Sequence, residues 1–88
     1  MDVGLLMLGH PGKAREIARR TEAAGFTHLA LGDTQNLGPE TWSQLMLVAG
    51  ASERLRIGTG VTNTTTRDVA VTASAALALQ QESGGRAF

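Results

Sequence analysis

One pattern occurs three times in this sequence: a short apolar run, a polar loop, and a longer segment with apolar residues at helical spacing. The apolar runs begin near residues 3, 28 and 55, and a fourth begins near residue 86, at spacings of 25, 27 and 31 residues. Such regular alternation is typical of βαβ units, which place parallel strands in one sheet. The pattern therefore predicts an α/β fold with a parallel sheet.

The first two units show the pattern clearly. Residues 3–8 (VGLLML) form a continuous apolar run, which is typical of a strand covered on both faces. Pro11 suits the first turn of the helix that follows. The second strand is predicted at residues 27–31 (THLAL), and Pro39 opens a second helix after a polar loop. The apolar stripe of that helix comprises Trp42, Leu45, Met46 and Ala49.

The third unit contains the most informative loop. Its strand begins at residues 55–57, and Gly58 and Gly60 then remove side chains from alternate positions where the strand ends. Glycine there permits close approach of a flat ligand, or only a turn that other residues resist. A polar loop follows, and Asp68 is a plausible N-cap for a third helix. That helix places Val69, Ala73, Ala76, Leu77 and Gln80 on one side.

The regular period favours an eight-stranded α/β barrel of the TIM type, which needs about 250 residues. At 88 residues the chain supplies three strand–helix units and the start of a fourth strand. The alternative is a doubly wound sheet, but residues 9–12 (GHPG) lack the glycine fingerprint expected after its first strand. We therefore expect residues 1–88 to be part of a barrel domain, truncated after the third unit.

The composition argues against several classes of function. Eight acidic and eight basic residues give a net charge of zero, so nothing favours nucleic acid or an anionic membrane surface. No apolar run approaches the roughly 20 residues of a membrane span, and no signal-like segment follows Met1. The chain has no cysteine, and its acids and histidines do not fall at metal-ligand spacing. We expect a cytoplasmic protein without a metal site.

Three stretches resemble the luciferase-like family of flavin and deazaflavin monooxygenases and reductases. They are residues 14–33 (AREIARRTEAAGFTHLALGD), 51–63 (ASERLRIGTGVTN) and 66–87 (TRDVAVTASAALALQQESGGRA). The sequence is most similar to the methylenetetrahydromethanopterin reductase type, which uses the deazaflavin coenzyme F-420. The resemblance implies that the chain is an amino-terminal piece of such a barrel. It also implies a cofactor ring that lies across the carboxyl ends of the strands.

The function implied by the resemblance is that of an oxidoreductase with FMN or coenzyme F-420 as its cofactor. Such a protein acts on a small organic substrate, either as a monooxygenase or as a reductase that transfers hydride. The full-length form is expected to be a homo-oligomer. The alternative is a non-catalytic, truncated barrel fragment that acts, if at all, by association.

The candidate site residues follow the predicted strands. The resemblance implies cofactor binding by Asp33, Gly60, Val61, Thr62 and Asn63. Asp33 can also be explained as a turn aspartate that bonds its own backbone. His10 ends the first strand on the same side and is the candidate for a catalytic role, although a histidine before a helix is more often a surface turn residue.

Three further expectations concern the same region. In the deazaflavin branch the bond that corresponds to Gly60–Val61 is a cis peptide, so the resemblance implies one here. Arg67 is expected either to bind a phosphate or to pair with Asp68 or Glu82 at the surface. His28, inside or just before the second strand, is expected to be structural.

Overall fold

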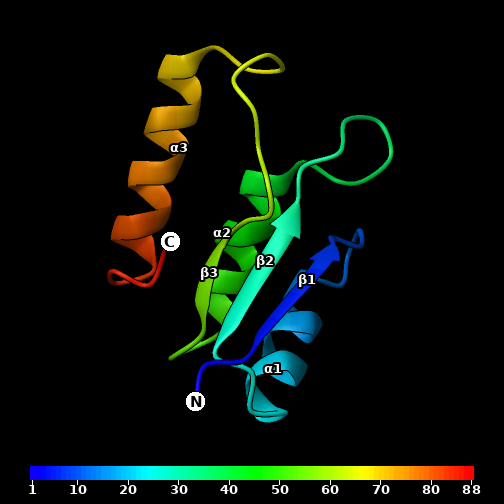
Figure 1. The fold of residues 1–88 in the computed structure, drawn as a ribbon, viewed down its shortest axis with the longest axis vertical. Helices are drawn as coiled ribbons and strands as arrows, with labels where there is room; N and C mark the ends of the chain where they lie inside the picture. Colours follow the sequence, from blue (N-terminus) through cyan, green and yellow to red (C-terminus); the bar gives the residue numbers. More distant parts are fainter.

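Strands and helices alternate strictly along the chain (Figure 1). In the computed structural model, which describes residues 1–88, they are β1 (Gly4–Leu8), α1 (Ala14–Ala23), β2 (His28–Gly32), α2 (Thr41–Ala51), β3 (Arg56–Thr59) and α3 (Val69–Glu82). Every predicted strand and helix is present. None of the three helices is both long enough and apolar enough to cross a membrane.

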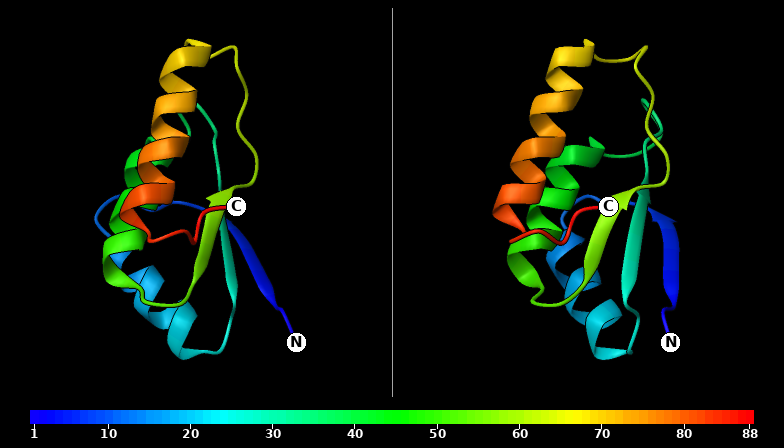
Figure 2. Two further views of the ribbon diagram at one scale, coloured as in Figure 1. Left: turned by 90° about the vertical axis from the view of Figure 1, so that its left-hand side faces the viewer. Right: turned by 60° about the vertical axis from the view of Figure 1, so that its left-hand side comes forward.

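The three strands are parallel and lie side by side in the order β1–β2–β3. Leu29 of β2 is in register with Leu5 of β1 and with Ile57 of β3. All three helices cover one face of the sheet, and the other face is open (Figure 2). A doubly wound sheet has helices on both faces, whereas a barrel has all of them outside. The order β1–β2–β3, continued by the bridge of Ala87 to Ile57 on the free edge of β3, is that of consecutive βα units of a TIM-type barrel, whereas in a doubly wound sheet of order 3-2-1-4 the fourth strand lies beside β1.

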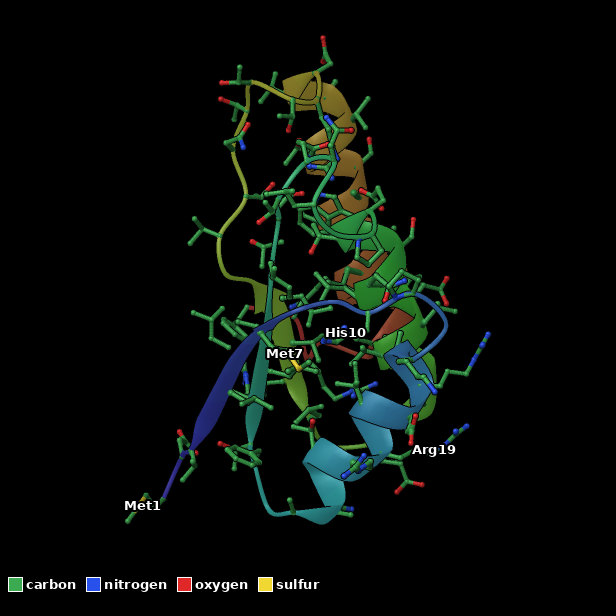
Figure 3. All side chains as sticks on the ribbon, turned by 90° about the vertical axis from the view of Figure 1, so that its right-hand side faces the viewer. Met1, Met7, His10 and Arg19 are labelled. Atoms are coloured by element: carbon green, nitrogen blue, oxygen red, sulfur yellow. The ribbon has the colours of Figure 1, made fainter.

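The hydrophobic core lies between the sheet and the helices. Leu29 and Leu31 point toward the helices, because alternate residues of a strand face opposite sides, and both are buried. Met7 of β1 points the same way (Figure 3) and packs against this core. The predicted stripe of α2 is confirmed, since its four members are buried or partly buried: Trp42, Leu45, Met46 and Ala49.

The inward side of α3 is not the one that the sequence pattern indicated. Leu79 is its one buried residue, and Thr72, Ala75 and Ala78 are half-buried beside it. The five residues that the pattern had grouped are all exposed: Val69, Ala73, Ala76, Leu77 and Gln80. The reason is that α3 is apolar almost all round, so its periodicity does not distinguish one side from another.

The last three residues pair with the outer edge of β3. Ala87 forms a parallel bridge with Ile57. The amide of Ile57 donates to the carbonyl of Arg86 at 3.0 Å, and the amide of Phe88 donates to the carbonyl of Ile57 at 2.9 Å. The strand expected near residue 86 therefore begins here, and the chain end lies beside β3 (Figure 1).

Glu22, near the end of α1, holds the turn between α2 and β3. Its carboxylate accepts hydrogen bonds from the amides of Glu53, Arg54 and Leu55, with the shortest at 2.7 Å. Burial alone would raise the pKa of Glu22, but these hydrogen bonds lower it more, so the pKa lies below its ordinary value. The amphipathic pattern of the helix gives no sign of this role.

Candidate functional site

The second half of β1 and the residues at and just after the ends of β2 and β3 form one groove at the carboxyl ends of the sheet. It has a volume of about 380 Å³ and is lined by Leu6, Met7, Leu8, Gly32, Asp33, Thr34, Gly60 and Val61. Part of its surface is apolar, because the side chains of Leu6, Leu8 and Val61 are 66%, 43% and 78% exposed. Asp33 and Thr34 supply its polar wall.

A larger hollow, of about 700 Å³, lies at the opposite ends of the strands. Most of its lining residues are polar or charged, and they include Glu22, His28, Arg54 and Arg56, beside the terminal Phe88. Ligands of parallel α/β sheets bind at the carboxyl ends of the strands, whereas the opposite ends serve stability. We therefore place the candidate site in the smaller groove.

Two glycines of the groove lie in close packing, Gly60 against a neighbouring Cβ atom as well as a side-chain end, and Gly32 against the end of one flexible side chain only. A Cβ atom on Gly60 would lie 2.6 Å from Leu6 Cδ1 and 2.9 Å from Ala30 Cβ. A Cβ atom on Gly32 would lie 2.8 Å from Leu8 Cδ2. The peptide bond Gly60–Val61 is cis, as the resemblance implied.

Asp33 is the centre of a buried ionic cluster. Its side chain is 2% exposed, and it forms a two-pronged ion pair with Arg67, at 2.6 Å from Nη1 to Oδ2 and 3.2 Å from Nη2 to Oδ1. Thr62 Oγ1 donates to Oδ2 at 2.6 Å, and Gln35 Nε2 donates to Oδ1 at 3.0 Å. The Arg67 hydrogen bonds lower the pKa of Asp33 more than burial raises it, so the carboxylate is ionised at neutral pH.

Glu40 extends the cluster to the start of α2. Arg67 Nη2 donates to Glu40 Oε1 at 2.7 Å, while Glu40 Oε2 caps α2 by accepting from the amide and hydroxyl of Ser43, both at 2.7 Å. Burial would raise the pKa of Glu40, but the bonds from Ser43 and Arg67 lower it below its ordinary value. The hydrogen bonds to Asp33 and then to Glu40 raise the pKa of Arg67. The cluster thus joins the loop after β2, the start of α2 and the loop after β3.

The candidate residues fall into three groups. Asp33, Gly60 and Val61 line the groove. Thr62 is half-buried beside it, with its hydroxyl on Asp33. Asn63 is exposed, and its Oδ1 accepts from the amides of Thr65 and Thr66 at 2.9 Å and 3.1 Å, which closes the loop on itself.

His10 does not line this groove. It is exposed at the end of β1 (Figure 3), in a separate hollow of about 410 Å³ that also involves Asn36, Leu37 and Pro39. His28, expected to be structural, bonds Thr27 Oγ1 through Nδ1 at 2.9 Å and meets the Phe88 ring edge-on. No group of three or more His, Cys, Asp or Glu side chains is placed to hold a metal ion.

The expected pairing of Arg67 with Asp68 or Glu82 was wrong. Its partners are Asp33 and Glu40, which lie 34 and 27 residues away in the sequence, rather than Asp68 or Glu82. Two carboxylates already neutralise the guanidinium, so it has no free charge to offer a phosphate. No local sequence pattern signals a pair at such separations, and this is why the cluster was missed.

A parallel sheet with helices on one face, continued strand by strand along the chain, is the architecture of a TIM-type α/β barrel, a fold whose ligands bind at the carboxyl ends of the strands. The profile of the luciferase-like monooxygenase family matches residues 3–88, and the chain belongs to this family.

Two relatives show where in the family the similarity lies. The chain is 37% identical over 76 residues to a 5,10-methylenetetrahydromethanopterin reductase of Methanolobus tindarius, covering 86% of this chain and 23% of that protein. The structure of this chain matches that of the coenzyme F-420 dependent tetrahydromethanopterin reductase of Methanopyrus kandleri with a TM-score of 0.84 and 31% sequence identity. That match covers 100% of this chain and 25% of the other. The chain therefore spans about a quarter of the length of these relatives.

Proposed function

We propose that this chain forms the cofactor-facing part of a deazaflavin-dependent oxidoreductase, in which hydride passes between coenzyme F-420 and a small organic substrate. The groove at the strand ends is the observation that carries the proposal. Similarity to two reductases, one of them described as coenzyme F-420 dependent, supports this cofactor. The barrel domain that these residues belong to is proposed to continue beyond the third βα unit.

The groove fits a flat, largely apolar ring with polar edges. Leu6, Leu8 and Val61 provide exposed apolar surface, and Gly60 brings the backbone close to the sheet because it has no side chain. The polar lining residues are Asp33 and Thr34, and of these the Asp33 side chain is turned into the protein, 2% exposed. Coenzyme F-420, when bound, supplies the ring that exchanges the hydride.

The work of this chain is to bind and shield that ring. We propose that Val61 and the Gly60 backbone contact one face of it and exclude water there. We propose that Thr62 and Asn63 shape the loop beside the ring, since their side chains form hydrogen bonds within the protein. His10 is retained only as a group that a bound substrate can approach from the neighbouring hollow.

A monooxygenase with FMN as its cofactor is the second candidate, because the family is described as luciferase-like monooxygenases. The apolar surface of the groove suits either ring. A non-catalytic role through association is the third, since the chain covers about a quarter of its relatives.

A binding experiment separates these candidates. The chain is titrated with coenzyme F-420 and with FMN, and binding is read from the NMR shifts of the amides of Asp33, Gly60 and Val61, because shifts detect the weak affinity of an open groove. We expect F-420 to move these amides more than FMN does. Val61→Asp should abolish the shifts, and Val71→Asp, an exposed valine on α3, should preserve them. Shifts spread over the surface, or lost equally in both variants, would contradict the proposal.

A further inference from the structure

We propose that Arg67 is a positioning residue of the groove, acting through Asp33 to hold the segment Gly60–Thr62 in place. The benefit to a ligand rests on the proposed function, whereas the effect on this segment does not. Arg67 lies outside the groove, and its contact with Asp33, 34 residues away in the sequence, connects it to the segment that forms one wall of the groove.

The carboxylate of Asp33 has no acceptor site left for a ligand. An ionised carboxylate offers about four lone-pair sites. Oδ1 accepts from Gln35 and Arg67, and Oδ2 accepts from Thr62 and Arg67, so four donors occupy the two oxygens. With its side chain 2% exposed, Asp33 acts on its protein neighbours rather than on bound molecules.

Those neighbours include the segment that forms one wall of the groove. The amide of Asp33 donates to the carbonyl of Val61 at 3.3 Å, and the hydroxyl of Thr62 donates to the Asp33 carboxylate at 2.6 Å. The amide of Gly60 donates to the carbonyl of Leu31 at 2.8 Å. Residues 60–62 are therefore attached to residues 31–33 by three hydrogen bonds, two of them made by Asp33.

Arg67 fixes the orientation of that carboxylate. Its planar guanidinium meets both oxygens of Asp33, a geometry that a lysine cannot reproduce. The remaining contact, with Glu40, ties the guanidinium to the capped start of α2 and prevents it from turning away. An anion-binding role does not compete with this one, because two carboxylates and one guanidinium leave a net negative charge.

The test uses amide hydrogen exchange, which reports local opening separately from global unfolding. In Arg67→Gln we expect exchange at Gly60 and Asp33 to rise about tenfold or more, because a charged hydrogen-bond pair is lost. Exchange at Ile57, whose amide bonds Arg86, should stay unchanged. Arg15→Gln, on the exposed face of α1, should change none of the three. An equal rise at all three amides, or no rise at Gly60 and Asp33, would overturn the proposal.

A double-mutant cycle tests whether Arg67 acts through Asp33. Asp33→Asn should raise the exchange rates of the same two amides. The rates in the double variant should be close to those in each single variant, because both substitutions remove the same Asp33–Arg67 pair. Additive effects would show that Arg67 does not act through Asp33 but by another route, such as its own 3.5 Å contact with Thr62 Oγ1, and would overturn the proposal. If Arg67→Gln does not fold, Arg67→Lys replaces it, with partial protection at Gly60 expected and full protection counting against the two-pronged geometry.

Ligand binding is measured on the same variants. Arg67→Gln should weaken the F-420-induced shifts of Gly60 and Val61, while Arg15→Gln should preserve them. If the unmodified chain binds neither F-420 nor FMN, the proposed function fails, and the exchange rates still decide the positioning role.

Discussion

At the scale of single residues, two carboxylates hold the loops of this chain together. Glu22 accepts three backbone amides at the amino ends of the strands, and Asp33 accepts four side-chain donors at the carboxyl ends. Both need their negative charge, and both have a lowered pKa. The two ends of the sheet are therefore held by charges that acid removes.

Acid should destabilise the fold in a defined pH range. The ordinary pKa values are 3.8 for Asp33 and 4.5 for Glu22, and folding lowers both. Each carboxylate thus stabilises the fold above its ordinary pKa, and this contribution disappears as the pH falls through the lowered value. We expect the midpoint of urea denaturation to be nearly constant above about pH 5 and to fall below it. In Asp33→Asn the urea midpoint should be lower at neutral pH and should fall less steeply with acid. Parallel pH curves for the two proteins would contradict this.

Gly60 is a groove residue at which a single added methyl group should destabilise the fold. In Gly60→Ala the new Cβ would meet Leu6 Cδ1, which can move, and Ala30 Cβ, which is fixed to the backbone. We expect a loss of about 1–3 kcal/mol in the free energy of unfolding. Gly50→Ala in α2 is the control, since nothing lies near its Cβ position and helix propensity predicts a gain of about 0.5–1 kcal/mol. Urea denaturation measures the free energy of unfolding of both variants. A Gly60→Ala variant as stable as the unmodified chain would contradict the packing argument.

At the scale of elements, Glu40 serves a helix and the ionic cluster at once. Glu40→Ala removes the α2 cap and one partner of Arg67, so we expect a loss of about 1–2 kcal/mol in unfolding free energy. Glu16→Ala removes only exposed pairs with Lys13 and Arg20, at 3.7 Å and 3.9 Å, and should cost less than about 0.5 kcal/mol. Equal losses in the two variants would show that the Glu40 contacts add nothing.

The sequence could predict contacts between residues that are close in the chain, but not contacts between residues that are far apart in it. The N-cap Asp68 bonds the amide of Ala70 at 2.8 Å, and such a contact is visible in adjacent letters. The strands followed from the order of the elements, and the family resemblance indicated three residues that line the groove, Asp33, Gly60 and Val61. The Asp33–Arg67 pair spans 34 residues and the Glu22–Leu55 bond 33, and no local pattern encodes them. The inward side of α3 was missed for a different reason, its uniformly apolar composition.

At the scale of the whole molecule, three strands with helices on one side leave the other side of the sheet uncovered (Figure 2). Leu6 and Leu8 of β1 and Val61 after β3 are exposed on or beside that side. In a closed barrel the same side faces the interior, filled by side chains from the other strands. A chain of a quarter of the relatives' length supplies no such strands.

We therefore expect the 88-residue chain to self-associate through this open face, since contiguous exposed apolar surface favours association. Sedimentation velocity over a range of concentrations should show dimers or larger species. Leu6→Gln should shift the distribution toward monomer, because Leu6 is 66% exposed on the open face. Leu77→Gln, at a residue 59% exposed on α3, is the matched control and should change little. If only Leu77→Gln dissociates the oligomers, α3 forms the interface and the prediction is wrong. A monomer at all concentrations would also contradict it, because the open face would then be stable in water.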